Sequence, residues 1–357
     1  MVTLEELLRK MVEMGGSDLH LTAGSPPRVR LDGELMCLEE EKLMPENGQQ
    51  LIYSVLNNDQ IARFEKNLEL DLSFGISGLG RFRVNVFQQR GAVGAVMRII
   101  PWEVRSMREL GLPERLCERL CMLPKGLILI TGATGAGKST TLAALVDYIN
   151  NTRNCHIVTI EDPIEFVHTN KKCLFNQREV GTDTHSFPAA LRSVLREDPD
   201  VVLIGEMRDQ ETISAALTLA ETGHLIFGTL HTSDCVQTVN RIVDVFPAYQ
   251  QAQIRTQLSF TIQAVFCQQL LQRAVGGGRM LACEIMIANS AVRALIRDDK
   301  AHQIYSVIQT CGKEGMKTMN ASLFDLYKAG QVAYEEALAH SVDPEELRRM
   351  LQATLRV

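Results

Sequence analysis

The sequence predicts an α/β fold with two domains, a small α+β domain followed by a larger domain on a mostly parallel, doubly wound sheet. Three observations lead to this prediction. The chain has 357 residues, which is too long for one compact core. Its first 100 residues contain short runs of alternating apolar and polar side chains, typical of an antiparallel sheet. From Leu127 onward, short apolar strands alternate with helical segments, typical of parallel sheets.

The composition indicates a soluble intracellular protein. A formal net charge of −6 argues against a general nucleic-acid binder, which needs a basic surface. The nine cysteines are scattered and odd in number, which favours a reducing compartment over a disulfide framework. Cys117 and Cys121 form the closest pair, without a second pair close enough for a four-thiolate zinc site. Met1–Met14 is acidic and unlike a signal peptide, and no apolar stretch approaches the roughly 20 residues that would insert directly into a membrane.

The first domain is expected over residues 1–100. Leucines at helical spacing predict a helix over Thr3–Met14, which Gly15 and Gly16 end, and a longer helix is predicted over Glu46–Lys66. Alternating runs predict strands at Asp18–Thr22, Arg28–Leu31, Leu70–Phe74, Arg81–Gln88 and Ala92–Ile99. Residues 101–115, punctuated by Pro101 and by Gly111-Leu112-Pro113, are expected to connect the domains.

The second domain is expected over residues 116–288. Its predicted strands are Leu127–Ile130, His156–Ile160, Val201–Ile204 and Leu225–Thr229. Its predicted helices are Thr140–Tyr148, Phe187–Arg196, Gln210–Glu221 and Tyr249–Gln268. A hairpin follows, made of Gln269–Ala274 and Met280–Ile287 and turned by three glycines. The remaining residues, 289–357, are predicted to be helical.

One glycine-rich segment predicts nucleotide binding. The pattern GxxxxGK[ST] is filled by Gly132, Ala133, Thr134, Gly135, Ala136, Gly137, Lys138 and Ser139, and Thr140 opens the helix that follows. A strand, this loop and a helix N-terminus direct backbone N–H groups and the positive end of the helix dipole at phosphate oxygens. Lys138 is expected to reach the β- and γ-phosphates of ATP, and the Ser139 hydroxyl to ligate Mg²⁺.

Acidic residues follow two other predicted strands. Thr159–Glu165 carries three carboxylates past a strand end, where ligands bind in open α/β sheets, although solvation alone can explain surface acids. Asp200–Glu206 resembles a Walker B strand in which Gly205 stands where the magnesium-binding Asp is usual. Glu206 is therefore expected to polarise the attacking water or to hold Mg²⁺ through a water molecule. Glu161 is expected to share the metal-binding work.

Two histidines flank the strand at Leu225–Thr229. A single histidine is usually a structural residue, so strand direction must discriminate between them. His231 follows the C-terminal end and is expected to face the phosphates as a sensor of the γ-phosphate. His224 lies at the opposite end and is expected to be structural or interfacial.

Arginines line two adjacent strands of the predicted first domain. They are Arg81, Arg83, Arg90 and Arg98, and solvated edge charges are the default explanation. Phosphoryl transfer, however, needs cations against the γ-phosphate, and Lys138 is the only cation nearby in sequence. Arginines from a mobile domain would supply that charge and couple domain position to nucleotide state.

The order of these motifs resembles the secretion ATPase superfamily and, within it, the type IV pilus retraction ATPases. The resemblance rests on the phosphate loop, Thr159–Glu165 (TIEDPIE), Val202–Asp209 (VLIGEMRD) and Gly223–Thr232 (GHLIFGTLHT), and runs essentially end to end from Ser17–Leu21. In that family these segments are the Asp box, an atypical Walker B and the His box, so Gly205 is a family feature.

The resemblance implies an N-terminal PAS-like domain, a RecA-like P-loop ATPase domain and a homohexameric ring with nucleotide between the domains. It also implies paired first-domain arginines at the γ-phosphate, which match Arg83 and Arg98, with Arg81 a weaker candidate. Its implied output is retraction of type IV pili and twitching motility. The chain would be cytoplasmic and would meet the inner membrane through the pilus platform protein.

Two features favour the retraction branch. The four-cysteine zinc module and the longer N-terminal region typical of extension and secretion members are absent from this sequence. Ala291–Asp298 resembles the retraction motif AIRNLIRE, with differences at Val292, Ala294 and Asp298. The alternatives are an accessory retraction paralogue, a pilus-extension or secretion ATPase, and a nucleotide-gated binding protein with negligible turnover.

Overall fold

The computed structural model describes residues 2–31, 33–100 and 104–354, and its internal contacts divide the chain into two units. The first unit comprises Met1–Glu103 together with the short segment Glu165–Val167. The second comprises Val104–Ile164 and His168–Val357. Of the predicted connector over residues 101–115, Pro101 and the next two residues lie outside the described residues, and Val104 onward belongs to the second unit.

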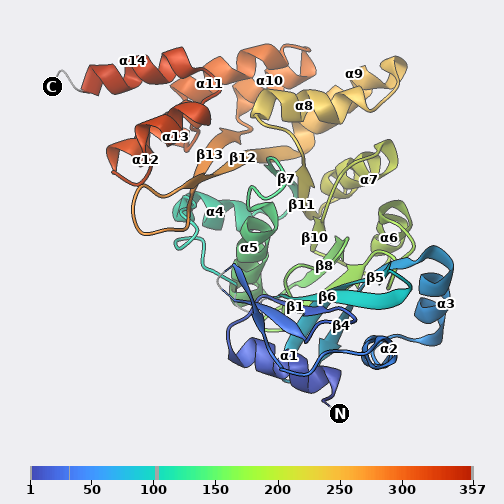
Figure 1. The fold of residues 1–357 in the computed structure, drawn as a ribbon. Coiled ribbons are helices and arrows are strands. Elements are labelled where there is room, and N and C mark those ends of the chain that lie inside the picture. The colour runs from blue at the N-terminus through green and yellow to red at the C-terminus, as the bar shows by residue number, and fades with distance from the viewer. Residues whose placement is uncertain (1, 32, 101–103, 355–357) are drawn as a thin grey trace. The chain divides into compact units, whose positions relative to one another are not determined.

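An antiparallel sheet forms the centre of the first unit, in the strand order β3-β2-β1-β6-β5-β4 (Figure 1). Its strands are β1 (Asp18–Leu21), β2 (Arg28–Leu31), β3 (Glu34–Cys37), β4 (Glu69–Ile76), β5 (Gly80–Gln89) and β6 (Ala92–Ile100). Helices α1 (Leu4–Glu13), α2 (Pro45–Tyr53) and α3 (Asn58–Asn67) accompany them. Alternate side chains of the strands join Leu7, Leu8 and Met11 of α1 in one buried core. The five predicted strands are confirmed, whereas β3, whose four residues are all exposed, was not predicted.

The prediction of a single helix over Glu46–Lys66 is wrong, because Asn57 begins a new helix. The Asn57 side chain accepts a hydrogen bond from the Gln60 backbone N at 2.9 Å. The Gln60 side chain in turn accepts one from the Asn57 backbone N, also at 2.9 Å. This reciprocal capping box satisfies two backbone donors that an uninterrupted helix would have bonded internally. The segment is therefore the two helices α2 and α3.

The second unit is built on a sheet in the order β13-β12-β7-β11-β10-β8-β9. All neighbouring pairs from β12 to β9 are parallel, and β13 pairs antiparallel with β12. The strands are β7 (Gly126–Thr131), β8 (His156–Glu161), β9 (Leu174–Glu179), β10 (Val201–Ile204), β11 (Leu225–Leu230), β12 (Ile262–Gln272) and β13 (Arg279–Ile287). The predicted α/β class with a mostly parallel sheet is therefore confirmed, although β9 was not predicted.

Helices cover both faces of this sheet (Figure 1). Leu127 and Leu129 of β7 pack in the core with α6 (Phe187–Val194), α7 (Gln210–Glu221), α8 (Cys235–Asp244), α9 (Ala248–Thr261), α10 (Ser290–Arg297) and α11 (Ile304–Thr310). Ile128 and Ile130 pack with α4 (Glu114–Cys121) and α5 (Lys138–Thr152). The alternation follows from the two-residue period of a strand, which sends successive side chains to opposite faces.

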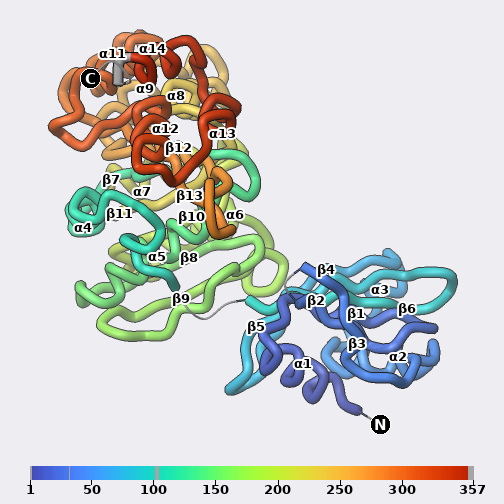
Figure 2. Tube along the Cα trace, turned by 60° about the vertical axis from the view of Figure 1, so that its left-hand side comes forward, coloured from blue at the N-terminus to red at the C-terminus, as the bar shows by residue number. Residues whose placement is uncertain are grey.

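The C-terminal helices α12 (Met319–Lys328), α13 (Tyr334–Ala339) and α14 (Pro344–Thr354) form a smaller core with Leu271 and Ala282 of the β12–β13 hairpin. Figure 2 shows α12 and α13 beside this hairpin. Among the residues that the structure describes, no helix has the length and apolar character needed to cross a membrane.

The predicted helix over Tyr249–Gln268 is wrong after Thr261. From Ile262 the chain is a strand, which pairs parallel with β7 and antiparallel with β13. Ala264–Gln268 are all buried, and the apolar run Ala264–Cys267 within them fits a buried helix and a central strand equally well. Pairing on both edges decides between them: β13 follows β12 after a short turn, whereas β7 lies far earlier in the chain. Helices α4 and α8 were also not predicted.

Candidate active site

The phosphate loop leaves β7 and enters α5 in a backbone conformation that requires glycine. Gly132 has φ 142°, and a Cβ there would lie 2.4 Å from the Gln268 carbonyl oxygen of β12. Gly137 has φ 86° and precedes the first residue of α5, Lys138, without a capping side chain. The absence of side chains at these positions leaves the N-terminal amides of α5 accessible to an anion.

Lys138 lies back over its own loop. Its Nζ donates to the Gly132 carbonyl oxygen at 2.8 Å and to the Ala133 carbonyl oxygen at 3.0 Å. The same Nζ lies 3.5 Å from His231 Nδ1. These contacts hold a positive charge at the mouth of the loop, and a phosphate group can replace the weakly bonded carbonyls as its partner.

Four of the predicted site segments end at one edge of the sheet. Strands β7, β11, β10 and β8 are consecutive and parallel, so their carboxyl ends lie side by side. The phosphate loop follows β7, His231 follows β11, Glu206 follows β10, and Glu161 is the last residue of β8. The structure therefore brings these segments together at the edge where open α/β sheets bind ligands.

The Glu206 carboxylate contacts the side chains of His231 and Arg208. Its Oε1 is 3.3 Å from His231 Nε2, and it forms an ion pair with Arg208. Burial raises the pKa of the Glu206 carboxyl, but the hydrogen bond and charge of Arg208, together with His231, lower it more. The net pKa lies below the ordinary value, so Glu206 is ionised at neutral pH and can accept a proton or orient water.

Gly205 lies too close to the end of β8 to carry a side chain without displacement. A Cβ at this position would lie 3.2 Å from both the Glu161 Cα and the Ile160 carbonyl oxygen. The Gly205 backbone N donates to that same carbonyl at 2.8 Å, and its own carbonyl accepts from the Thr229 hydroxyl. This packing gives a physical reason for the missing Walker B Asp.

Glu161 is held toward β9. Its Oε1 accepts a hydrogen bond from the Thr159 hydroxyl at 2.7 Å and another from Gln177 Nε2 at 3.2 Å. The side chain is half-buried, whereas Asp162 is exposed. Of the remaining carboxylates in the segment, Glu165 belongs to the first unit. Glu161 is thus the member of the acidic segment that the second unit positions at the strand end.

His224 lies at the opposite end of β11 from His231, as strand direction predicted. Its Nδ1 is 3.0 Å from the Leu219 carbonyl oxygen and 3.3 Å from the Thr222 hydroxyl. Both partners lie at the end of α7, so His224 closes the turn between α7 and β11. This geometry supports a structural role.

Three of the four predicted first-unit arginines lie on β5 or β6, and the fourth, Arg90, does not. Arg83 and Arg98 are direct neighbours in the β5–β6 register and are both exposed. Arg98 Nε donates to the buried Asp18 at 2.7 Å, and Arg81 donates to the Ser73 hydroxyl at 2.7 Å. The expectation that Arg90 lines a strand is wrong: with φ 50° it lies in the turn between β5 and β6. The action of Arg83 and Arg98 on a nucleotide in the second unit remains a prediction.

Two residues at the loop were not identified from the sequence. Arg279, the first residue of β13, donates to the Gly135 carbonyl oxygen at 3.5 Å. Buried Gln268 donates from Nε2 to the Thr141 hydroxyl at 2.8 Å and so fixes the first turn of α5. Gln268 was assigned to a helix, and only the β7–β12 pairing brings it to the loop. The three glycines before Arg279 predict the turn of the hairpin, and they were the one sequence feature that pointed to this region.

The helix that resembles the retraction motif is α10. Arg293 donates to the backbone carbonyl oxygens of Ser259 at 2.6 Å and Phe260 at 3.1 Å, and to Gln263 Oε1 at 3.0 Å. Burial lowers the pKa of its guanidinium. Arg297, in the last turn of α10, is exposed. The first of the two arginines therefore anchors α10 to the junction of α9 and β12.

Comparison with known proteins places the chain in a family. Residues 2–339 match the family model described as type II/IV secretion system protein. The chain is 52% identical over 342 residues to the type IV pilus retraction ATPase PilT of Pseudomonas aeruginosa, covering 96% of this chain and 99% of that protein. It is 41% identical over 348 residues to the type IV pilus ATPase PilU of the same organism, covering 98% and 91%.

The fold comparison agrees. A crystal structure of the pilus retraction motor PilT with bound ADP superimposes with a TM-score of 0.91 at 51% identity, covering 98% of this chain and 100% of that one. This match confirms the predicted fold, including the first-unit sheet and the C-terminal helices. The chain therefore belongs to the type II/IV secretion system protein family, in its branch of type IV pilus retraction ATPases.

Proposed function

We propose that this chain is an ATP-hydrolysing motor that retracts type IV pili and thereby supports twitching motility. The observation that carries the proposal is the chain of contacts from Lys138 through His231 to Glu206 beside a complete phosphate loop. A protein that only bound nucleotide would not need an ionised carboxylate held at this position. Membership of the retraction branch supports the pilus as the object on which the motor acts.

ATP is the substrate, and Gly132–Thr140 would receive its phosphates. The amides at the start of α5 bind the phosphate oxygens, and Lys138 exchanges its two loop carbonyls for the β- and γ-phosphates. Glu206 orients the attacking water and accepts its proton, since its carboxylate is ionised at neutral pH. Because His231 contacts both Lys138 and Glu206, movement of Lys138 onto a γ-phosphate would be transmitted to the carboxylate.

Mg²⁺ is the metal that this donor set suits. The Ser139 hydroxyl and the Glu161 and Glu206 carboxylates are hard oxygen donors, which prefer Mg²⁺ over softer metals. The Glu161 carboxylate, which accepts hydrogen bonds from the Thr159 hydroxyl and Gln177 Nε2, lies at the end of β8 beside the other predicted site segments. When bound, the ion would neutralise phosphate charge, with Ser139 as the direct protein ligand and Glu161 as a further one.

The assembly and the cellular setting are part of the proposal. Arg83 and Arg98 are neighbouring cations that would stabilise the charge spread over the γ-phosphate when the first unit closes on the nucleotide. Such closures around a homohexameric ring would apply force to a platform protein at the pilus base. The protein would be cytoplasmic and associated with the inner membrane only through that partner.

Phosphate release from the purified protein and from its Glu206→Gln variant tests the proposal, with the oligomer mass recorded in the same samples. Activity confined to a six-subunit species and lost in the variant is the expected result. Turnover that persists in the variant would remove Glu206 from the mechanism. A monomer without turnover would favour a nucleotide-gated binding protein.

A second candidate is an accessory retraction paralogue, favoured by the three differences in the α10 motif. Expression of this chain in a strain that lacks its retraction ATPase discriminates between the two. A retraction motor restores twitching on its own, whereas an accessory paralogue does so only when a second retraction ATPase is present. A pilus-extension or secretion ATPase would restore twitching in neither case.

A further inference from the structure

Two cysteines face each other at the start of two neighbouring strands. Cys155 precedes β8 and Cys173 precedes β9, and their Sγ atoms lie 3.4 Å apart. The parallel β8–β9 register begins one residue later, with His156 opposite Leu174, and the Leu174 backbone N donates to the Cys155 carbonyl at 3.0 Å. Paired strands lie about 4.8 Å apart, inside the range of Cα separations that a disulfide spans.

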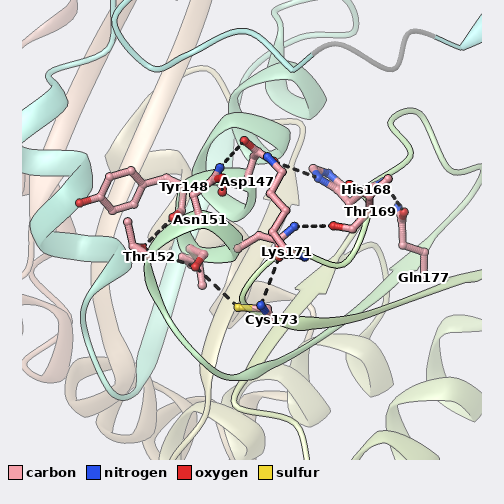
Figure 3. Close-up of polar contacts among 11 residues, drawn as sticks. Asp147, Tyr148, Asn151, Thr152, His168, Thr169, Lys171, Cys173 and Gln177 are labelled. Carbon is pink, nitrogen blue, oxygen red and sulfur yellow. Dashed lines mark hydrogen bonds and ion pairs between the residues drawn. The ribbon is translucent and has the colours of Figure 1, made fainter.

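The backbone around Cys173 is fixed to the end of α5. Its Sγ donates to the Arg153 carbonyl oxygen at 3.0 Å, and its backbone N lies 3.4 Å from Asn150 Oδ1. Figure 3 shows the preceding residues bound to the same helix, where Lys171 Nζ pairs with Asp147 at 2.7 Å. The Asn150 side chain also donates to the Thr169 carbonyl oxygen at 2.8 Å. Cys173 is therefore held in place by these contacts, and the Cys155 backbone by the Leu174 N–H.

Accessibility separates this pair from the other close pair of cysteines. Cys235 and Cys267 have Sγ atoms 3.7 Å apart, but both residues are 0% exposed. Beside them, both carboxylate oxygens of Glu284 already accept backbone N–H groups, from Cys235 and Met319. Cys155, in contrast, is half-buried and meets solvent, while Cys173 behind it is buried. Of these four cysteines, Cys155 is therefore the one at which we expect a reagent from solution to react first.

We propose that Cys155 and Cys173 are a modification site: they form a reversible disulfide with each other by exchange with low-molecular-weight disulfides such as oxidised glutathione. The Cys155 thiolate attacks one glutathione sulfur, forms a mixed disulfide and releases one glutathione thiolate. Cys173 then attacks the Cys155 sulfur and releases the second. In total, two protein thiols lose two electrons and two protons, and one oxidised glutathione becomes two reduced molecules.

The closed covalent loop would contain a functional segment. Residues 156–172 lie between the two cysteines, and they include Glu161 and the segment Glu165–Val167 that belongs to the first unit. The disulfide would link the two ends of the segment 156–172 covalently. Oxidation is therefore a chemical route by which the thiol–disulfide balance of the surroundings restrains the acidic segment.

The reaction is expected to be slow at neutral pH. Burial, followed by the neighbouring Cys173, raises the pKa of the Cys155 thiol to about 12, so the thiolate is scarce. Thiol–disulfide exchange extends over seconds to hours, and equilibration here is expected at the slow end of that range. An equilibrium measurement is therefore the appropriate test.

The full chain is equilibrated for a day in reduced and oxidised glutathione at several ratios, quenched with acid, unfolded and alkylated. Trypsin cuts after Arg153, Lys171, Lys172 and Arg178, so the two cysteines fall in separate peptides. We expect a joined peptide of residues 154–171 and 173–178, two hydrogens lighter than their sum, in oxidising buffer, and its loss on return to reducing buffer. Cys235 and Cys267 should remain alkylated.

Three controls keep the test decisive. Exposed Cys37 reports whether glutathione reacts at all, because it has no cysteine close in sequence and should carry a mixed disulfide. Cys173→Ser should leave Cys155 as a mixed disulfide, and Cys155→Ser should leave Cys173 free. The proposal is overturned if Cys37 is modified in oxidising buffer while wild-type Cys155 remains free or stops at the mixed disulfide.

Discussion

His231 Nε2 lies 3.3 Å from Glu206 Oε1, a contact that fixes which ring nitrogen carries the proton. The other ring nitrogen, Nδ1, faces the Lys138 ammonium at 3.5 Å and must act as an acceptor. With Nδ1 as the acceptor, the ring donates from Nε2 to the carboxylate. The imidazole contacts Lys138 through one ring nitrogen and orients the Glu206 carboxylate through the other.

Glu206→Gln is expected to lower the rate of phosphate release by roughly 10²–10⁴ because the amide cannot accept a proton from water. Nucleotide binding should persist, since the phosphate loop is untouched. Stopped-flow phosphate detection and titration with a fluorescent nucleotide separate the two effects. Loss of binding together with turnover would mean that the carboxylate supports the loop rather than the chemistry.

His231→Ala is expected to lower kcat by about tenfold or more, as the carboxylate loses the group that orients it. His224→Ala is the matched control, because it removes the same ring from the other end of the same strand. That variant should retain kcat and lose only some stability. Equal losses of kcat in both variants would contradict the role given to His231.

Gly205→Ala is expected to destabilise the second unit by about 1–3 kcal/mol, the usual cost of forcing an extra methyl group into a packed site. Its Cβ would press on the Glu161 Cα and the Ile160 carbonyl. Gly312→Ala is the control, since nothing lies within 4 Å of a Cβ there. Urea denaturation of both variants gives the comparison, and equal midpoints would show that the strand end yields easily.

His168 is expected to make folding stability pH-dependent. Burial lowers the pKa of this imidazole to about 4, although Asp147, 4.0 Å away, acts in the opposite direction and Lys171 reinforces the shift. Between pH 6.5 and about 4 the unfolded chain binds the extra proton, so stability falls as the pH decreases through this window. The loss reaches up to about 3 kcal/mol.

Denaturation midpoints of the wild type and of His168→Gln across this window check the expectation. The variant should lose stability less steeply as the pH falls, even if loss of the stack on Phe175 lowers its midpoint throughout. Parallel curves for the two proteins would assign the acid sensitivity to other groups.

Arg279→Ala is expected to weaken nucleotide binding by several-fold, because its guanidinium lies at the Gly135 carbonyl of the phosphate loop. Arg273→Ala, another exposed arginine of the same hairpin region, is the matched control and should bind normally. Calorimetric titration with ADP measures both. Identical affinities for all three proteins would make the Arg279 contact incidental.

The phosphate loop, Glu206, Glu161 and His231 could be located from the sequence because each follows an apolar strand. In a parallel sheet, that rule alone brings the segments to one edge. Gln268 and Arg279 could not be located in this way. Their approach to the loop depends on β12 beside β7, and the apolar run that forms β12 has no periodicity to distinguish it from a helix.

The sequence predicts the fold of the first unit except for the exposed strand β3 and for the break between α2 and α3, which local hydrogen bonds decide. Asn57 is compatible with a helix interior by pattern, yet its side chain caps a new helix. The approach of Cys155 to Cys173 was equally hidden. The two residues are 18 positions apart, and the strand that brings them together, β9, is largely polar in sequence.

The crowding at Gly205 also bears on how such a protein can evolve. A position at which a methyl group already forces its neighbours to shift is less favourable still for aspartate, so restoring by one substitution the carboxylate found in other phosphate-loop enzymes is expected to lower stability. A lineage with this strand end would have to move the end of β8 before it regained that residue. Selection acting one substitution at a time would instead refine the residues around Gly205. The replacement of the Walker B Asp by glycine would then become hard to reverse.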